Sequence, residues 1–264
     1  MTEKRFTNKV ALITGGSSGI GRATALAFAR EGAAVMIASR GIDRGQSVLR
    51  ELQELGAEAG FVSTDVSQRL QVENLIRETV KRFGRIDCAF NNAGTVSVGG
   101  FKQTADFSET EFDGHLALNL KSVWLCMKHE ILQMLQQGSG GTIVNTSSIN
   151  GLGGVAMNSF YATAKAGILA LTKSAAQEYA PKGIRINSIV PGGFLTPMLE
   201  GVFASISPDD PSAAEKSYAG MIPLGRVGKP DEAAAAVLWL CSEASSYVTG
   251  HSMIVDGGVT APYR

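Results

Sequence analysis

The first apolar strand and the glycine-rich turn after it indicate the fold of this chain. Val10-Ala-Leu-Ile-Thr14 runs directly into Gly15-Gly16-Ser17-Ser18-Gly19-Ile20-Gly21, and a helical pattern begins at Ile20. Glycines let the backbone turn tightly and approach a pyrophosphate, whose charge is favoured by free N–H groups at a helix N-terminus. The stretch is not a literal GxGxxG, so a merely flexible turn is the alternative. Its place between strand and helix predicts a dinucleotide-binding turn.

Apolar runs and amphipathic stretches alternate along the rest of the chain. The runs predict strands at 10–14, 34–38, 61–63, 87–90, 142–146, 184–190 and 252–255. The stretches between them predict helices at 20–31, 43–55, 67–82, 159–179 and 231–241, and a long helix that ends near residue 137. This alternation is typical of a parallel sheet covered on both faces. We expect one doubly wound, Rossmann-type α/β domain over residues 1–264, with a mostly parallel seven-stranded sheet.

Proline is concentrated late in the chain. Six of the eight prolines lie between Pro191 and Pro230, mixed with Gly and Ser. The strand and helix pattern resumes after this segment, so it is not a linker between domains. We expect residues 191–230 to form a loop with short helices over a substrate pocket.

Charge and metal-ligand content exclude several function classes. Lys plus Arg and Asp plus Glu number 24 each, so the chain lacks the one-sided positive field that nucleic acid or an anionic membrane needs. The chain has three cysteines and three histidines, at Cys88, Cys126, Cys241, His115, His129 and His251. They are dispersed and lack the spacing of metal ligands, so the sequence predicts neither a disulfide framework nor a metal site. We expect no metal and no nucleic-acid partner.

Hydrophobicity argues against a membrane protein. The segment from Met1 to Lys9 is charged and leaves no room for a signal peptide before the first strand. Residues 131–164 carry no Asp, Glu, Lys or Arg, but Gly, Ser, Asn and Thr interrupt them too often for a membrane span. A cytoplasmic location is expected.

The end of the second predicted strand bears on the choice of dinucleotide. An acidic residue there would hydrogen-bond the adenosine ribose 2′-hydroxyl of NAD. The chain has Ser39-Arg40 instead, and the guanidinium of Arg40 suits the 2′-phosphate of NADP. We therefore expect NADP rather than NAD. In the alternative, Arg40 only faces solvent and Asp43 serves the ribose.

Tyr161 and Lys165 lie four positions apart on a predicted helix, so their side chains share one face. A free tyrosine titrates near 10, and lowering its pKa by two to three units requires about 3–4 kcal/mol of preference for the phenolate. A cation about 4 Å away supplies only about 1 kcal/mol in water but about 4 kcal/mol at an effective dielectric near 20. The pair therefore predicts an acid–base site that is partly closed to water.

With Ser148 just after the fifth predicted strand and Asn119 in the long helix before it, the chain resembles the short-chain dehydrogenase/reductase family, in its classical form, over nearly its whole length. The features that carry the resemblance are the TGxxxGIG turn at 14–21, Asp65-Val66, Asn91-Asn92-Ala93-Gly94, Asn119, Ser148, Tyr161 with Lys165, Pro191-Gly192 with Thr196, and Asp256-Gly257-Gly258. One departure is Phe194, where the family usually has Ile or Val.

The resemblance implies a role for each residue of the catalytic set. Tyr161 would give a proton in carbonyl reduction and take one in alcohol oxidation, and Ser148 would hydrogen-bond the substrate oxygen. Lys165 would bind the nicotinamide ribose and lower the pKa of Tyr161, while Asn119 would hold a water linked to the lysine.

The resemblance also implies contacts with the cofactor. It assigns these to the turn residues Gly15, Ser17, Ser18, Gly19, Ile20 and Gly21, to Ser39 and Arg40, to Asp65 and Val66 at the adenine, to Asn91, Ala93 and Gly94, to Tyr161 and Lys165, and to Pro191, Gly192, Phe194 and Thr196 at the nicotinamide. Asp65 has an alternative role as a cap of the next helix, and Asn92 as a turn residue.

These observations lead to one functional hypothesis. We expect an NADP(H)-dependent oxidoreductase that reduces a ketone to a secondary alcohol or catalyses the reverse reaction. The candidate pocket walls are Ser148, Leu152, Met157, Phe194, Met198 and Val96, which predicts a mainly apolar substrate. The alternatives are an NAD-dependent enzyme, reduction of an imine or polarised double bond, and a non-catalytic dinucleotide sensor or scaffold. The resemblance further implies a homotetramer or homodimer.

Overall fold

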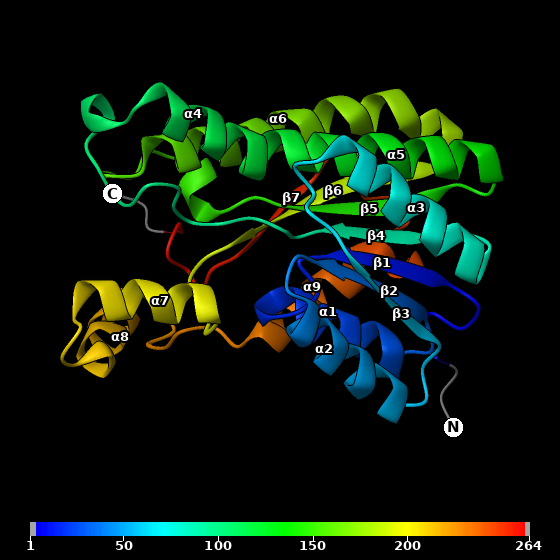
Figure 1. Ribbon diagram of the computed structural model, residues 1–264, viewed down its shortest axis with the longest axis horizontal. Coiled ribbons are helices and arrows are strands. Elements are labelled where there is room, and N and C mark those ends of the chain that lie inside the picture. Colours follow the sequence, from blue (N-terminus) through cyan, green and yellow to red (C-terminus); the bar gives the residue numbers. More distant parts are fainter. Residues whose placement is uncertain (1–3, 262–264) are drawn as a thin grey trace.

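A seven-stranded parallel sheet runs through the middle of the molecule (Figure 1). The computed structural model describes residues 4–261, so residues 1–3 of the charged N-terminal segment lie outside it. The strands, in the order in which they pair, are β3 (Ala59–Ser63), β2 (Ala34–Ser39), β1 (Val10–Thr14), β4 (Cys88–Asn91), β5 (Gly141–Thr146), β6 (Ile184–Pro191) and β7 (Ser252–Val255). The doubly wound α/β fold is confirmed, and all six strand pairings are parallel.

Helices cover both faces of the sheet (Figure 1). One layer holds α1 (Gly19–Arg30), α2 (Ile42–Glu54) and α9 (Pro230–Cys241), and the other holds α3 (Arg69–Phe83), α5 (Ser122–Gln137) and α6 (Ser159–Tyr179). Glycines in the left-handed region end two of them, Gly84 after α3 at φ 80° and Gly138 after α5 at φ 70°. Only glycine adopts this conformation without steric cost, which explains why the helices stop there.

The strands are buried on both faces because each face packs against its own layer of helices. Val35 and Ile37 of β2 belong to the apolar cluster under α1, whereas Met36 and Ala38 of the same strand belong to the cluster on the opposite face. Successive residues of a strand point to opposite faces. A strand buried on both faces therefore has to be apolar throughout, as the sequence pattern shows.

The order of the strands creates a switch point beside β1. Thr14 at the end of β1 pairs with Ala38 of β2 on one side and with Asn91 of β4 on the other. The connections leave these neighbouring strands toward opposite faces, so a crevice opens at their carboxyl ends. The glycine-rich turn lies in this crevice.

The predicted long helix before β5 is not a uniform α-helix. Helix α4 (Glu109–Leu116) passes through a π-helical turn, Ala117–Lys121, into α5. Such turns insert one residue into the hydrogen-bonding ladder and are frequent at functional sites. Asn119 lies in this turn and is fully buried.

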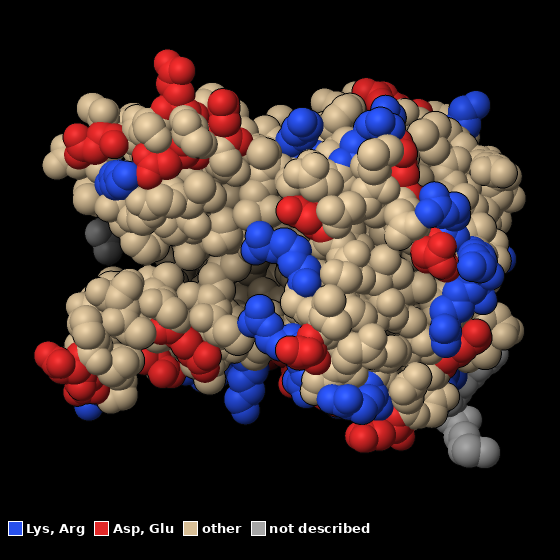
Figure 2. Space-filling view, in the orientation of Figure 1, with Lys and Arg blue, Asp and Glu red and all other residues tan. Residues whose placement is uncertain are grey.

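The proline-rich segment contains two helices outside the sheet. Helix α7 (Pro197–Ile206) and helix α8 (Pro211–Gly220) project beyond the carboxyl ends of the strands (Figure 1). Figure 2 shows a hollow between this pair and the lobe that carries α4, with Lys and Arg side chains along part of its border. Among residues 4–261, no helix is long and apolar enough to cross a membrane, and no cluster of potential metal ligands occurs.

Candidate active site

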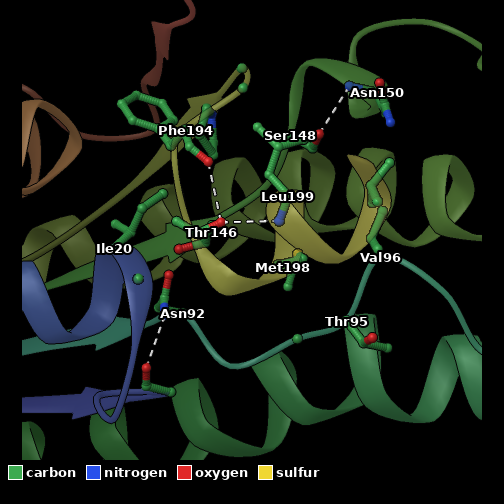
Figure 3. Close-up of a pocket in the computed structure, with 18 of the residues that line it drawn as sticks. Ile20, Asn92, Thr95, Val96, Thr146, Ser148, Asn150, Phe194, Met198 and Leu199 are labelled. Atoms are coloured by element: carbon green, nitrogen blue, oxygen red, sulfur yellow. Dashed lines mark hydrogen bonds between the residues drawn. The ribbon is translucent and has the colours of Figure 1, made fainter. Parts of the chain in front are cut away.

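A cavity of about 280 Å³ lies at the carboxyl ends of β1, β4, β5 and β6. Its walls come from segments that are far apart in the sequence but meet at this edge of the sheet (Figure 3). They are residues 15 and 18–20 of the turn, 92–96 after β4, 146–150 after β5, Tyr161 and Lys165 of α6, 191–194 after β6, and 196–199, Val202 and Tyr218 of the α7–α8 segment. The two ends of the cavity differ in chemistry.

One end is the glycine-rich turn and the start of α1. Gly15 and Gly19 have φ values of 66° and 51°, and a Cβ on Gly15 would lie 3.0 Å from the backbone nitrogen of Ala93. Ser18 precedes the helix without a side-chain cap hydrogen bond, and Gly19 and Ile20 of the first turn line the cavity, so their N–H groups are available to a ligand there. A pyrophosphate fits here, because these N–H groups can donate to its oxygens and the glycines have no side chain that would keep it from the backbone. Ser17 and Gly21 belong to the turn but do not line the cavity.

The segment after β4 presents Asn92 to the cavity and turns Asn91 away from it. Asn91 is 2% exposed, and its Nδ2 donates to Glu130 Oε2 at 2.9 Å and to Asn145 Oδ1 at 3.1 Å. The Asn92 amide contacts the Gly15 carbonyl oxygen at 3.4 Å (Figure 3). Asn91 therefore joins neighbouring strands within the core, while Asn92, Ala93 and Gly94 lie beside the turn.

The register of the sheet places Ser39 and Arg40 beside the glycine-rich turn. Thr14 pairs with Ala38, and the Gly16 N–H donates to the Ala38 carbonyl oxygen at 3.2 Å. Arg40 is exposed, and Arg44 packs over Gly41. Neither arginine lines the main cavity, so both lie outside it on the side of the turn.

Asp65 and Val66 do not reach the cavity either. The Asp65 carboxylate accepts from the Ser67 N–H at 2.9 Å and from the Ser67 hydroxyl at 2.7 Å. Val66 is 5% exposed and packs against Val72 and Leu125. In this structure the side chain of Asp65 stabilises the turn that leads into α3, but it does not cap that helix, whose N-cap residue is Gln68.

The other end of the cavity holds two hydroxyl groups and an ammonium group. Tyr161 and Lys165 face it from α6, and Ser148 faces it from the end of β5. Lys165 is 4% exposed, its Nζ donates to the Thr146 carbonyl oxygen at 2.9 Å, and it lies 5.6 Å from the centre of the Tyr161 ring. The Ser148 hydroxyl accepts from the Asn150 N–H at 3.2 Å (Figure 3). The helical spacing thus places the pair on one face.

Burial controls the titration of this pair. It lowers the pKa of Lys165 to about 8, because the charged ammonium loses hydration. Burial also raises the pKa of Tyr161 above its ordinary value of 10, while the hydrogen bond with the neighbouring Ser148 hydroxyl acts in the opposite direction. In the chain by itself, desolvation of the phenolate is the larger effect, and the expected lowering of the tyrosine pKa stays a prediction for the enzyme with its dinucleotide bound.

Asn119 lies behind the cavity wall, not in it. Its Oδ1 accepts from the Thr95 N–H at 2.9 Å, and its Nδ2 is buried without a hydrogen-bond partner among residues 4–261. A Cβ on Gly94 would lie 3.0 Å from the Asn119 Oδ1 and 3.6 Å from the Lys165 Nζ. Gly94 therefore lets the asparagine amide and the lysine approach each other.

The loop after β6 closes the cavity above the turn. Thr196 caps α7 by accepting from the Leu199 N–H at 3.3 Å, and its methyl group lies where a Cβ on Gly19 would contact it at 3.0 Å. Phe194 is 6% exposed, lines the cavity with Pro191 and Gly192, and packs on Gly228. The phenyl group thus forms part of the wall between the turn and α7.

Two predicted pocket residues lie elsewhere, and several lining residues were missed. Leu152 faces a separate depression near Thr260, and Met157, at φ 66°, lines neither hollow. Met198 does line the cavity, as does Val96. The missed residues include Thr95, Asn150, Leu199, Val202 and Tyr218. Only the position of Thr95, directly after Gly94, gave a local signal, because the others depend on how the loops fold back.

Comparisons with known proteins agree with this architecture. A family model described as enoyl-(acyl carrier protein) reductase matches residues 15–260. The chain is 41% identical to levodione reductase of Leifsonia aquatica over 262 residues, covering 98% of this chain and 97% of that protein. It is 39% identical to cyclohexanol dehydrogenase of Acinetobacter sp. (strain SE19), covering 97% of both. The crystal structure of levodione reductase superposes with a TM-score of 0.94 at 40% identity, over 98% of this chain and 100% of that chain.

This similarity extends over nearly the whole chain. The predicted resemblance is therefore confirmed: the chain belongs to the short-chain dehydrogenase/reductase family and is an NAD(P)-dependent oxidoreductase that acts on alcohol or ketone groups.

Proposed function

We propose that this protein is an NADP(H)-dependent enzyme that reduces a compact, mainly apolar ketone to a secondary alcohol or catalyses the reverse reaction. The observation that carries the proposal is the cavity itself. An anion-binding helix start forms one end, and the hydroxyls of Ser148 and Tyr161 with the ammonium of Lys165 form the other. The dinucleotide supplies or accepts the hydride when bound.

The chain's own residues then handle the substrate oxygen and its proton. The Ser148 hydroxyl donates a hydrogen bond to that oxygen, and the Tyr161 hydroxyl gives it a proton in the direction of reduction. The Lys165 ammonium favours the phenolate that remains on Tyr161. The buried amide of Asn119 holds Thr95 and, through Gly94, sits beside the lysine.

The remaining cofactor contacts follow from the positions of the lining residues. Gly15, Ser18, Gly19 and Ile20 would hold the pyrophosphate, and Ala93, Gly94, Pro191, Gly192, Phe194 and Thr196 would enclose the nicotinamide half. Asn92 lies beside the turn, whereas the side chain of Asn91, to which the resemblance gave a cofactor contact, donates to Glu130.

The preference for NADP rests on the end of β2. Ser39 carries no charge that would repel a 2′-phosphate, and Arg40 is exposed beside the turn with no ion-pair partner among the described residues. A guanidinium binds a phosphate with paired hydrogen bonds. Asp43, in the first turn of α2, is the residue that would favour NAD instead.

The apolar wall and the named relatives support the substrate class. Val96, Phe194, Met198, Leu199 and Val202 line the substrate end, and none carries a charge. Levodione reductase and cyclohexanol dehydrogenase are named for reactions at ketone or alcohol groups. The family model, in contrast, is described as an enoyl reductase, which keeps reduction of a polarised double bond as a second candidate.

The first experiment measures NADPH consumption with cyclohexanone and with an α,β-unsaturated ketone, followed by product identification. Carbonyl reduction gives the secondary alcohol, and the Tyr161→Phe variant should lower kcat/KM by at least about 10²-fold with the fold retained. A saturated ketone as the product would overturn the assignment in favour of double-bond reduction. Dinucleotide binding without turnover of either substrate would contradict the proposed substrate class.

The second experiment tests the cofactor. Arg40→Ala should raise the KM for NADPH about tenfold or more and leave the KM for NADH nearly unchanged, since a charge-assisted pair contributes about 1.5–3 kcal/mol. Asp43→Ala is the matched control on the same turn. An equal effect of Arg40→Ala on both dinucleotides would remove the case for the phosphate.

We also propose that the chain assembles into a homodimer or homotetramer. Trp124, Leu132 and Leu135 on α5 are large apolar side chains that are 38–53% exposed. A second copy of the chain would remove such surface from water. Light scattering at micromolar concentration tests this, and a monomeric mass would contradict it.

A further inference from the structure

The segment between Gly94 and Lys102 forms a wall of the cavity and is held at four points along its backbone. The Thr95 N–H donates to Asn119 Oδ1 at 2.9 Å, and the Val96 carbonyl oxygen accepts from Asn158 Nδ2 at 2.8 Å. Further along, the Val98 N–H donates to a histidine and the Lys102 N–H donates to the Met157 carbonyl oxygen at 2.9 Å. Figure 3 places Thr95 and Val96 on the pocket wall.

Three of these four contacts involve groups that do not change charge near neutral pH, and the fourth involves His115. The Nε2 atom of His115 accepts from the Val98 N–H at 3.1 Å. This histidine is fully buried on α4. Its ring lies 5.9 Å from the Phe107 ring at an interplanar angle of 85° and 6.4 Å from the Phe160 ring. The mechanism proposed above does not use it.

We infer that His115 is a positioning residue for substrate binding: as a neutral imidazole it fixes the cavity wall at Val96 through the Val98 N–H, and its protonation releases that wall. The inference rests on the proposed function, because it takes Thr95 and Val96 to face the carbonyl substrate.

The chemistry of the imidazole gives the direction of the effect. Neutral imidazole can accept one hydrogen bond, but in the imidazolium form both nitrogens are donors. A protonated His115 would direct an N–H group at the Val98 N–H, so the contact would become repulsive. Desolvation lowers the pKa of His115 from its ordinary value of 6.5, which keeps the acceptor form at neutral pH.

The surroundings of His115 do not neutralise an imidazolium effectively. Phe160 of α6 and Phe107 before α4 face the ring from outside its own helix. Glu111, one turn earlier on α4, raises the pKa of His115, but its carboxylate pairs with Lys102. The protonated ring would therefore stay unfavourable in its present position, and relief comes from movement of the loop.

Kinetics of three variants test the role of the acceptor. With cyclohexanone and NADPH, wild type should show a KM for the ketone that rises about fivefold as the pH falls below 6.5, with kcat and the Kd for NADPH nearly constant. His115→Leu should show the high KM at every pH, and His115→Gln should show the low KM at every pH, because its amide oxygen accepts without titrating. His129→Gln is the matched control, since burial also lowers the pKa of His129 but its ring lies beside Glu73.

A second measurement needs no turnover and separates this inference from the proposed function. Hydrogen exchange of the peptide that contains Val98, in the free protein and corrected for intrinsic rates, should show protection at pH 7.5 that is lost at pH 5.0. His115→Gln should retain protection at both values, and His129→Gln should behave as wild type. If wild-type protection is the same at both values, or His115→Gln and His115→Leu give the same KM profile, the inference is wrong. If His115→Gln does not fold, the inference is tested by the exchange of the Val98 peptide in wild type and in His129→Gln, both of which should lose protection at pH 5.0.

Discussion

Removing the charge of Lys165 tests whether a buried ammonium makes Tyr161 acidic. The Nζ atom lies 5.6 Å from the centre of the tyrosine ring, in a site where both side chains are less than a tenth exposed. With the phenolate charge taken at the ring centre, the attraction at this separation is about 3 kcal/mol at an effective dielectric near 20, but only about 0.7 kcal/mol in water. The first value would lower the pKa of Tyr161 by about two units, and the second by about half a unit.

The two groups share their titration. Burial lowers the pKa of Lys165 to about 8 and raises that of Tyr161, so loss of one proton near pH 8 leaves a single proton for the two groups to share, and the apparent pKa belongs to both residues. The form that accepts a proton from the alcohol has Tyr161 as the phenolate and Lys165 as the ammonium, and the attraction between these charges sets how much of that form is present. In Lys165→Met only the phenol remains, so its pKa stays above 10. Alcohol oxidation needs the deprotonated pair and therefore reports this shift.

The assay is the pH dependence of kcat/KM for oxidation of cyclohexanol at saturating NADP. In wild type the activity should rise through about pH 8, and in Lys165→Met the rise should move up by about two units, with roughly a 10²-fold loss at pH 8. The position of the rise is the readout, because weaker cofactor binding would lower the rate without moving it. Lys173→Met, an exposed position on the same helix, should leave the profile unchanged. A shift of half a unit or less in Lys165→Met would refute the electrostatic role.

Three further substitutions test the glycine-rich turn, the core and the α7–α8 segment. Gly15→Ala should weaken NADPH binding and destabilise the fold by about 1 kcal/mol or more, because φ is 66° there; fluorescence titration and thermal unfolding measure the two effects. Burial raises the pKa of Glu130 to about 8, so wild type loses stability as the pH rises from 4.5 to 8, by roughly 1 kcal/mol per unit, while Glu130→Gln should not show this loss in urea unfolding. Parallel curves for the two proteins would contradict that assignment. A Cβ at Gly193 would overlap the Tyr218 ring, so Gly193→Ala should displace α8 and raise the KM for the ketone while the Kd for NADPH stays the same.

The direction of the tyrosine pKa shows how burial and charge compete at this site. The lysine is close, yet it is itself partly discharged by the same burial that disfavours the phenolate. A low-dielectric environment strengthens the attraction between the two charges, and it also penalises forming each of them. Proton exchange near neutral pH therefore depends on the pair together, which is why the pH profile, and not the presence of either residue, is the decisive measurement.

The amino-acid sequence by itself determined the alternation of strands and helices, the dinucleotide-binding turn and the shared face of Tyr161 and Lys165. These features follow from local periodicity and from glycine at positions of positive φ, so they can be read from neighbouring residues. The sequence also indicated that β2 is buried on both faces, because every residue of that strand before Ser39 is small or apolar.

Only the tertiary structure decided which side chains meet the cavity and which serve the core. It turned Asn91 toward Glu130 and Asn92 toward Gly15, although the two asparagines are adjacent in the sequence. It also brought His115 into contact with Val98, although His115 lies on α4 and none of the residues that line the cavity belongs to that helix. Such contacts depend on strand register and on how loops fold back over the sheet, and these are set by packing between residues far apart in the chain.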